Sequence, residues 1–112
     1  MVKPSVPFEK FIEMDIRVGT IISAEAVVGS GKLLKLEVDF GEEVGKRQIL
    51  SGIAKYFTIE DLINKQAVFL VSLEIKMIMG LESQGMLLVA EEEGKIVLLR
   101  PAIDVINGSI VR

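Results

Sequence analysis

The spacing of hydrophobic and polar residues predicts strands along most of the chain. Residues 34–40, LKLEVDF, alternate apolar and charged side chains, which is the pattern of a half-buried strand. Residues 16–28 form a longer run rich in β-branched side chains, with Gly19 placed where a barrel strand bends sharply. Residues 46–53 have the composition of a third strand, and glycine-containing turns separate the three segments. This order predicts an antiparallel meander.

A short helix is predicted before the first strand. Phe8, Phe11 and Ile12 fall at positions i, i+3 and i+4, and Pro7 stands where the first turn of a helix tolerates proline. We therefore expect a helix over residues 8–13 whose two phenylalanines pack on the barrel or on a partner subunit.

A second helix is predicted after the third strand. Thr58 is followed three residues later by Asp61, which resembles a capping box, and Leu62 and Ile63 supply a buried face before Asn64. Beyond this helix we expect a fourth strand over residues 67–73, a fifth over 86–91, and an apolar tail over 95–99 and 103–111 with an Asn107-Gly108 turn.

The loop between the fourth and fifth strands has an unusual composition. Met77, Ile78 and Met79 form an apolar lead-in where solvent-facing residues would be expected, and a polar tip, ESQ, follows at residues 82–84. Loops of this kind commonly bind a partner. Met79 itself is more simply explained as a gap-filling core residue beside a strand.

The predicted order of elements, β-β-β-α-β-β, is that of an OB-fold. We therefore predict a mainly all-β fold, a five-stranded Greek-key barrel with a short helix between strands three and four, an N-terminal helix and C-terminal tail strands. A chain of 112 residues can bury one core but not two, and no linker or repeat divides it. Residues 1–112 are expected to form a single OB-fold domain.

Composition adds an expectation about assembly. Half of the residues are hydrophobic even before the ten glycines are counted, whereas globular domains reach about 45–50 % with glycine included. One small core cannot bury so much apolar surface, so we expect a homodimer. The tail strands and the fourth-strand region supply its candidate contacts, Leu73, Ile75, Ile78 and Ile110. No apolar run is long enough to span a membrane and no signal peptide is evident, so we expect a cytoplasmic protein.

The chain contains no cysteine and no histidine. These absences exclude disulfides, thiolate and imidazole metal sites, and every Ser-His or Cys-His nucleophile. No paired carboxylates mark a catalytic motif, and the acidic run at residues 91–93 is better explained as a solvated turn. We therefore expect no catalytic residue, no metal and no cofactor. The net charge of −3 disfavours charge-driven coating of nucleic acid but allows a local basic face.

Four motifs, in order along the chain, resemble those of one known family. They are DIRVG at residues 15–19, GSGKLL at 29–34, RQILSGI at 47–53 and MGLESQGMLL at 79–88. Together they resemble the tRNA-binding domain family, which includes the C-terminal domain or separate beta subunit of methionyl-tRNA synthetase and free-standing tRNA-binding proteins. The chaperone-like CsaA proteins are relatives. The resemblance covers residues 8–111.

The resemblance implies an OB-fold homodimer that grips tRNA by shape and backbone, is not itself an enzyme, and raises tRNA affinity for aminoacylation. Its implied partners are tRNA, a second copy and, as a further candidate, the catalytic chain of methionyl-tRNA synthetase. A CsaA-like chaperone or a free-standing structure-specific tRNA-binding protein is the alternative. A chain that starts at Met1 and ends soon after the tail is expected to be an independent polypeptide, although an excised domain would have the same limits.

An OB-fold binds oligonucleotides across strands two and three and the loops that join strands one to two and four to five. This surface gathers cations that can pair with phosphates, namely Lys32, Lys35, Arg47, Lys55 and Lys76. Ser83 and Gln84 lie near them, and the resemblance places Met86 in the binding loop. Ser51 either ends the third strand or donates to a phosphate or ribose.

Some of these residues have a second explanation, and some depart from the family pattern. Any single exposed lysine is as consistent with a solvated surface residue as with an RNA contact. Arg17 is as consistent with an ion pair to Asp15 or Glu37 as with an RNA contact. Gly31 stands where the family often has an acid, and Lys76 lacks the bidentate fork of the arginine common there. With five Phe and one Tyr in the chain, recognition of duplex shape is favoured over base stacking.

Overall fold

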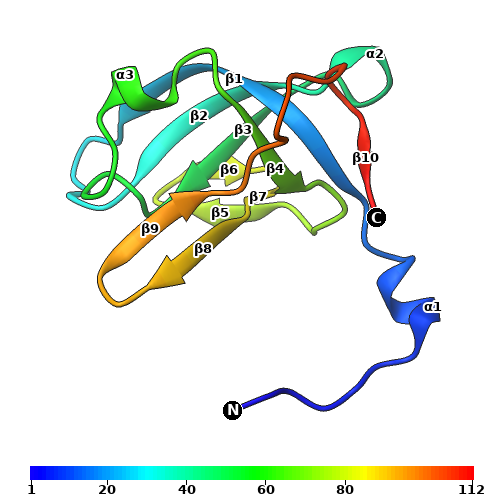
Figure 1. Cartoon of the computed structure of the whole chain (residues 1–112). Helices are drawn as coiled ribbons and strands as arrows, with labels where there is room; N and C mark the ends of the chain where they lie inside the picture. The colour runs from blue at the N-terminus through cyan, green and yellow to red at the C-terminus, as the bar shows by residue number, and fades with distance from the viewer.

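The computed structural model describes all 112 residues, with ten strands and three one-turn helices (Figure 1). The helices are α1 (Phe8–Phe11), α2 (Gly41–Val44) and α3 (Ile59–Leu62). The strands are β1 (Ile16–Ala26), β2 (Leu34–Asp39), β3 (Lys46–Ser51), β4 (Gln66–Leu70), β5 (Lys76–Ile78), β6 (Leu81–Ser83), β7 (Met86–Leu87), β8 (Val89–Glu92), β9 (Lys95–Leu98) and β10 (Ile110–Val111). The mainly β class predicted from the sequence is confirmed.

Most of the strands form one antiparallel sheet in the order β3-β2-β1-β4-β7, and β10 pairs with the start of β1. The sheet curls around the interior like an opened barrel (Figure 1). β1 is its central strand, because its first half pairs with β4 and its second half pairs with β2. The register shifts between Ile21 and Ser23, an irregularity that lets β1 change direction between its partners. The predicted meander of the first three strands is correct.

Gly19 is required by close packing, and the register irregularity of β1 lies further along, between Ile21 and Ser23. A Cβ at this position would lie 2.7 Å from the ring of Phe40 and 2.7 Å from Cγ1 of Val38. The Phe40 ring packs edge-on against Phe69, with ring centroids 5.2 Å apart. These side chains belong to the buried core, which also contains Ile21, Leu36, Ile49 and Leu62.

The helix α3 begins as the sequence predicts. The Thr58 hydroxyl accepts a hydrogen bond from the backbone N–H of Asp61, and the Asp61 carboxylate accepts one from the Thr58 N–H. These bonds hold the pKa of Asp61 below its usual value. Leu62 is fully buried, so the short helix is anchored on the core.

The segment expected to be a loop between the fourth and fifth strands contains a hairpin. β5 and β6 pair with each other and turn at Met79-Gly80. Both turn residues have positive φ, 50° and 79°, as a two-residue hairpin turn requires. Met79 at this tip is 55 % exposed, so the prediction that it fills the core is wrong.

The C-terminal third also differs from the prediction. The expected fifth strand is divided between β7, which pairs with β4, and β8, which forms a hairpin with β9. The tail before β10 is irregular, and side chains hold it in addition to the backbone bonds that Val18 makes with Gly108 and Ser109. Gln66 bonds both the N–H and the carbonyl of Val105, and the Thr20 hydroxyl donates to Oδ1 of Asn107 at 2.7 Å.

The helix α1 projects away from the barrel and has no buried residue (Figure 1). Phe8 is 70 % exposed and Ile12 is 61 % exposed. The two phenylalanine rings lie 6.1 Å apart, centroid to centroid. Packing of these rings on their own barrel is therefore wrong, and the alternative, a partner subunit, stays a prediction. None of the three helices is long and apolar enough to cross a membrane.

Candidate nucleic-acid interface

The polar motif at residues 82–84 closes the barrel between β3 and β7. The backbone N–H of Gln48 donates to Oε1 of Gln84, and the Gln84 N–H donates back to the Gln48 carbonyl, each at 2.8 Å. Nearby, the Leu50 N–H donates to the Ser83 hydroxyl at 3.0 Å, and that hydroxyl donates to the Gly85 carbonyl at 3.1 Å. At this seam, between β3 and residues 82–84, hydrogen bonds that involve side chains join the two edges of the sheet in place of a regular β ladder.

These contacts change the roles expected for two residues. Ser83 is 4 % exposed and its hydroxyl is engaged as donor and acceptor within the protein, so it has a structural role, and its contact with RNA stays a prediction. Gln84 is half-buried and uses its side-chain oxygen at the seam. Their partners lie 33 and 36 positions earlier in the chain, which is why local sequence signals did not reveal the seam.

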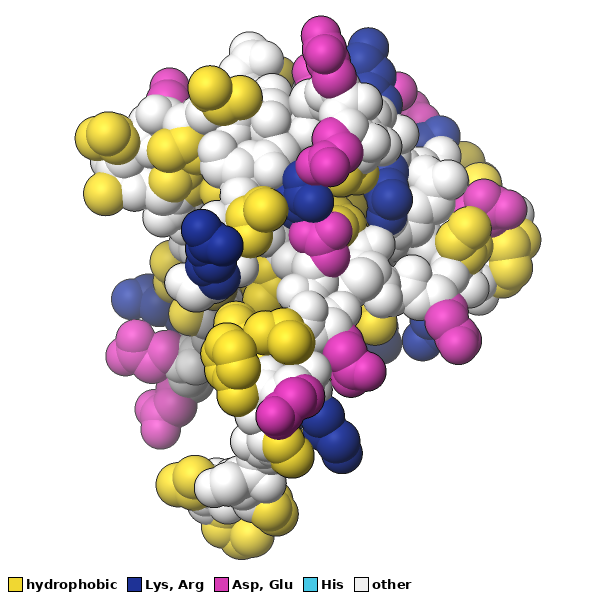
Figure 2. All heavy atoms as spheres, turned by 90° about the vertical axis from the view of Figure 1, so that its right-hand side faces the viewer, with side chains coloured by type: hydrophobic (Ala, Val, Ile, Leu, Met, Phe, Trp, Pro, Cys, Tyr) yellow, Lys and Arg dark blue, Asp and Glu magenta, His cyan; other side chains and the backbone are white.

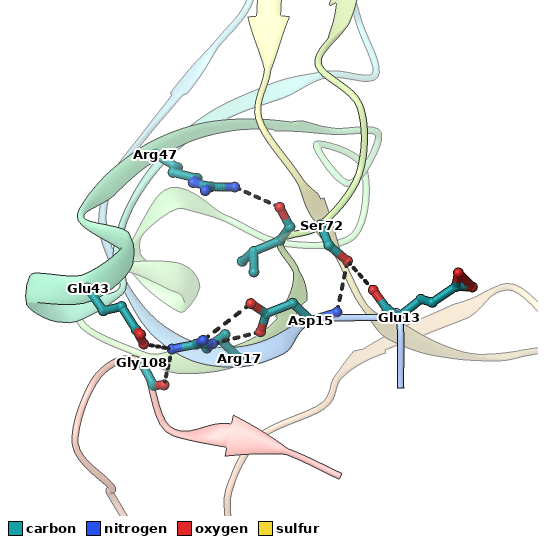
Figure 3. A network of polar contacts seen from close by, with 8 residues as sticks. Glu13, Asp15, Arg17, Glu43, Arg47, Ser72 and Gly108 are labelled. Atoms are coloured by element: carbon teal, nitrogen blue, oxygen red, sulfur yellow. Dashed lines mark hydrogen bonds and ion pairs between the residues drawn. The ribbon is translucent and has the colours of Figure 1, made fainter. Parts of the chain in front are cut away.

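Arg47 reaches from β3 to the end of β4. Its Nη1 donates to the carbonyl of Val71 at 2.7 Å (Figure 3) and to that of Gln84 at 3.3 Å. The guanidinium thereby positions the start of the loop after β4. Its Nε and Nη2 have no hydrogen-bond partner in the protein, so they remain available for the phosphate contact predicted from the sequence.

The outer face of β1, β2 and β3 carries a polar hollow of about 360 Å³ beside Arg47. Lys35 and Lys46 contribute cations to it, and Glu25 and Glu37 contribute carboxylates. Lys35 is paired with Glu25 at 2.6 Å, whereas Lys46 takes part in no ion pair. Within this polar hollow, Lys46 is therefore the lysine freer to meet a phosphate.

Lys32, Lys55 and Ser51 lie at the opposite end of β3. The Ala54 N–H donates to the carbonyl of Lys32 at 3.0 Å, which joins the loop before β2 to the loop after β3. Ser51 is the last residue of β3, as one of its two explanations predicted. Both lysines are exposed and take part in no ion pair. Their grouping with the cations of the polar hollow on one RNA-binding surface stays a prediction.

A groove of about 670 Å³ lies between the loop after β4 and the β5–β6 hairpin. Lys76 and Met86, two predicted RNA contacts, line this hairpin groove together with Leu73, Ile75 and Ile78, three predicted dimer contacts. The structure therefore brings together residues that the sequence analysis assigned to two different surfaces.

Ile110, the fourth predicted dimer contact, lies elsewhere. With Phe8, Phe11, Ile12 and Met14 it lines an apolar hollow of about 440 Å³, the α1 hollow. On the face of the molecule that carries α1 and the C-terminus, hydrophobic side chains gather in several exposed patches between charged ones (Figure 2). The four predicted dimer contacts do not form a single surface.

Arg17 is a structural ion-pair partner (Figure 3). Its side chain is 11 % exposed, its Nε lies 2.7 Å from Oδ1 of Asp15, and its Nη1 contacts Glu43 and the Gly108 carbonyl. Hydrogen bonds to Asp15 and to Glu43 hold the pKa of Arg17 above its usual value. The expected pair with Asp15 is confirmed, the one with Glu37 is wrong, and Glu43 takes its place. The buried guanidinium has little surface left for RNA.

Ser72, which lines the hairpin groove, bonds the residues on either side of Met14, which lines the α1 hollow. Its hydroxyl accepts a hydrogen bond from the Asp15 N–H at 2.8 Å and donates to the Glu13 carbonyl at 3.4 Å (Figure 3). This contact holds the segment between α1 and β1 against the loop after β4. The two apolar surfaces are therefore neighbours.

Residues 16–110, from the first residue of β1 to the first of β10, match the sequence model of the family described as "Putative tRNA binding domain". The chain belongs to this tRNA-binding domain family. It is 48 % identical over 110 residues to a methionine–tRNA ligase of Methanothrix thermoacetophila and 44 % identical over 104 residues to one of Caldanaerobacter subterraneus. The alignments cover 98 % and 93 % of this chain but 16 % of each relative, so the chain spans about a sixth of these curated relatives.

Two solved structures similar to this tRNA-binding domain carry different kinds of names. A MetRS related protein from Pyrococcus horikoshii has a TM-score of 0.90 and 37 % identity, over 98 % of this chain and 100 % of that one. Chaperone CsaA from Bacillus anthracis has a TM-score of 0.87 and 34 % identity, over 97 % of this chain and 100 % of that one. One fold thus carries both synthetase-related and chaperone names.

Sequence reasoning missed Lys46 on this tRNA-binding domain, although a signal for it was present. The alternation in residues 34–40 shows which β2 side chains face outward, and Asp39 is one of them. Pairing that strand with β3 sets Lys46 opposite Asp39, on the same outer face. The register between β2 and β3, rather than the residue type, therefore indicated that Lys46 lies on the outer face.

Proposed function

We propose that this domain binds folded tRNA as the RNA-binding module of a methionyl-tRNA synthetase, either appended to the catalytic chain or as a separate subunit. The observation that carries the proposal is a row of cations along one side of the barrel. Lys46 and Arg47 line the polar hollow, Arg47 also borders Leu73 and Ile75, and Lys76 lines the hairpin groove. Membership of the tRNA-binding domain family indicates which polyanion these cations meet.

The composition of this surface suits the RNA backbone better than stacked bases. Lys46 and Lys76 take part in no ion pair, and Arg47 retains two free nitrogens. Phe40 and Phe69 are buried in the core and cannot stack on bases. Phosphate contacts position RNA without specifying its sequence, so the shape of a folded tRNA becomes the feature that is recognised.

The proposal includes a homodimer whose interface is the α1 hollow. Phe8, Phe11 and Ile12 of the helix and Ile110 of β10 are all exposed in the single chain. A second copy would bury these side chains and leave the cation row on each subunit free. Residues 1–112 then act as one domain with no catalytic role of its own. By binding tRNA, this domain raises the affinity of the catalytic chain for tRNA.

Fluorescence anisotropy with labelled tRNA tests the RNA-binding part. For four to six phosphate contacts, log K should fall with log salt at a slope of roughly −3 to −5. Lys46→Ala and Lys76→Ala should each weaken binding to all tRNAs alike and make the slope shallower by about one unit. Lys95→Ala, on the β8–β9 hairpin, is the matched control and should change neither quantity.

Two results would contradict this function. One is equal affinity for folded tRNA and for the same tRNA heat-unfolded without magnesium, because shape recognition requires the folded form. The other is an unchanged salt slope in both lysine variants. Recovery of the catalytic chain of methionyl-tRNA synthetase in a pull-down from the native cytosol would support the synthetase assignment, and recovery of tRNA alone would support a free-standing protein.

A CsaA-like chaperone activity is the second candidate. The structural similarity to chaperone CsaA and the exposed apolar side chains of the hairpin groove favour it. It predicts that an unfolded polypeptide binds the domain and displaces tRNA.

A further inference from the structure

The hairpin groove combines apolar side chains with unpaired backbone groups. Leu73 is 43 % exposed, Ile75 is 58 % exposed and Met86 is 44 % exposed. None of the backbone N–H or carbonyl groups of residues 72–75 has a hydrogen-bond partner in the protein. A ligand that fits such a surface has a flat apolar face and a hydrogen-bonding edge.

The charges around the hairpin groove indicate which class of molecule contains such a ligand group. Arg47 borders Leu73 and Ile75, and Lys76 lines the groove itself, whereas Glu74 is its only acidic residue. Cations beside an apolar surface are complementary to a nucleotide, in which a phosphate adjoins a base.

The backbone geometry argues against an extended peptide as the occupant. Peptides that add to a sheet edge need a straight strand to pair with. Ser72 and Leu73 instead form a bend between β4 and β5. A bent segment offers no straight edge to a second strand, so a compact ring fits it better.

We propose that the hairpin groove holds one unpaired nucleobase of the bound RNA, with an adjoining phosphate at the free nitrogens of Arg47. The base lies against Leu73, Ile75 and Met86, and its edge meets the unpaired backbone groups of residues 72–75. This inference rests on the proposed RNA-binding function and adds to it a single-base contact within recognition of overall shape. RNA with an unpaired nucleotide beside a duplex is then preferred over an uninterrupted duplex.

Three RNA hairpins of equal stem length test the proposal: one without a bulge, one with a single-nucleotide bulge, and one with an abasic residue at the bulge. The bulged RNA should bind about tenfold more tightly than the other two, because only its base can cover the apolar side chains of the hairpin groove. Ile75→Ser should remove this difference while leaving the affinity for the unbulged hairpin unchanged. Ile106→Ser is the control, because Ile106 is 85 % exposed in the tail and lies outside the hairpin groove.

Equal affinity for the bulged and abasic hairpins would overturn the inference, and so would an Ile75→Ser variant that weakens all three alike. Displacement of the bulged hairpin, but not the unbulged one, by a reduced and carboxymethylated polypeptide would assign the hairpin groove to polypeptide instead. If none of the three hairpins bound while folded tRNA still did, the inference would be overturned and the RNA-binding function would stand; if folded tRNA did not bind either, the RNA-binding function itself would be contradicted.

Discussion

Gln48 and Gln84 exchange two hydrogen bonds of 2.8 Å across the seam of the barrel, one through the Gln84 side chain and one through its backbone. Gln84→Leu removes the acceptor and leaves the Gln48 N–H unpaired, so the free energy of unfolding should fall by about 1–2 kcal/mol. Gln84→Glu keeps an acceptor oxygen and should lose less. Urea denaturation measures both, and equal losses would contradict the role assigned to the side-chain oxygen.

Ser83→Ala separates a structural role from an RNA contact. The substitution leaves the buried Leu50 N–H without its acceptor, so we expect a loss of about 1–3 kcal/mol in the free energy of unfolding. RNA affinity, measured well below the unfolding transition, should stay within about twofold of the original, since the Ser83 hydroxyl is already bonded to Leu50 and Gly85 within the protein. Ser51→Ala is the control for stability, because no hydrogen bond of the Ser51 side chain is present. Normal stability with lost affinity would restore Ser83 to the RNA-binding surface.

Gly19→Ala should destabilise the core. The new methyl group would stand 2.7 Å from Phe40 and Val38, and overpacking of this kind costs about 1–3 kcal/mol. Gly31→Ala, whose Cβ meets no atom within 4 Å, should change stability by no more than about 0.5 kcal/mol. Thermal unfolding of the two variants compares them directly, and a similar Tm for both would show that the core accommodates the methyl group.

Arg17 and Glu43 should differ in their importance although they contact each other. Arg17→Met removes bonds to Asp15, Glu43 and the Gly108 carbonyl at once. We expect a loss of about 2–3 kcal/mol, below the 3–5 kcal/mol of a fully buried pair because Asp15 remains partly hydrated. Glu43→Gln should cost less than about 1 kcal/mol, since the Glu43 side chain is 78 % exposed. Equal losses in chemical denaturation would contradict this assignment.

Two aspartate substitutions locate the dimer interface. Ile110→Asp places a charge in the α1 hollow and should shift sedimentation towards the monomer. Ile78→Asp places one in the hairpin groove and should leave the dimer intact. The reverse result would move the interface to the hairpin groove and would also contradict a nucleobase there. Val28→Asp, at a position 97 % exposed, controls for the added charge.

Local signals in the sequence predicted local structure well. The alternation in residues 34–40 identified β2, and the Thr58–Asp61 spacing identified the cap of α3, because each depends on neighbours within a few residues. The β5–β6 hairpin was missed because its apolar residues do not alternate. The motif at residues 82–84 was noticed but misread, since its partners on β3 depend on how the barrel closes.

The same distinction applies to individual charges. The pair between Arg17 and Asp15 was foreseen because only two positions separate them, whereas Glu43, 26 positions away, was not. Lys32, at the β1–β2 loop, and Lys76, on the β5–β6 hairpin, were grouped on one surface because the OB-fold suggested it, and the two elements are in contact, since a Cβ at Gly29 would lie 3.5 Å from Cε of Met79. The residue types were informative, but their grouping required the register of the sheet.

The central position of β1 also determines when this domain can fold. β1 ends at residue 26, but its partners are β2, which ends at residue 39, β4, which ends at residue 70, and β10, which ends at residue 111. During synthesis, one edge of β1 therefore stays open until β4 has been made, and its start is completed only with the last residues. Such distant pairings slow folding and expose strand edges in the nascent chain. The ribosome must nearly finish the domain before its central strand has all its partners.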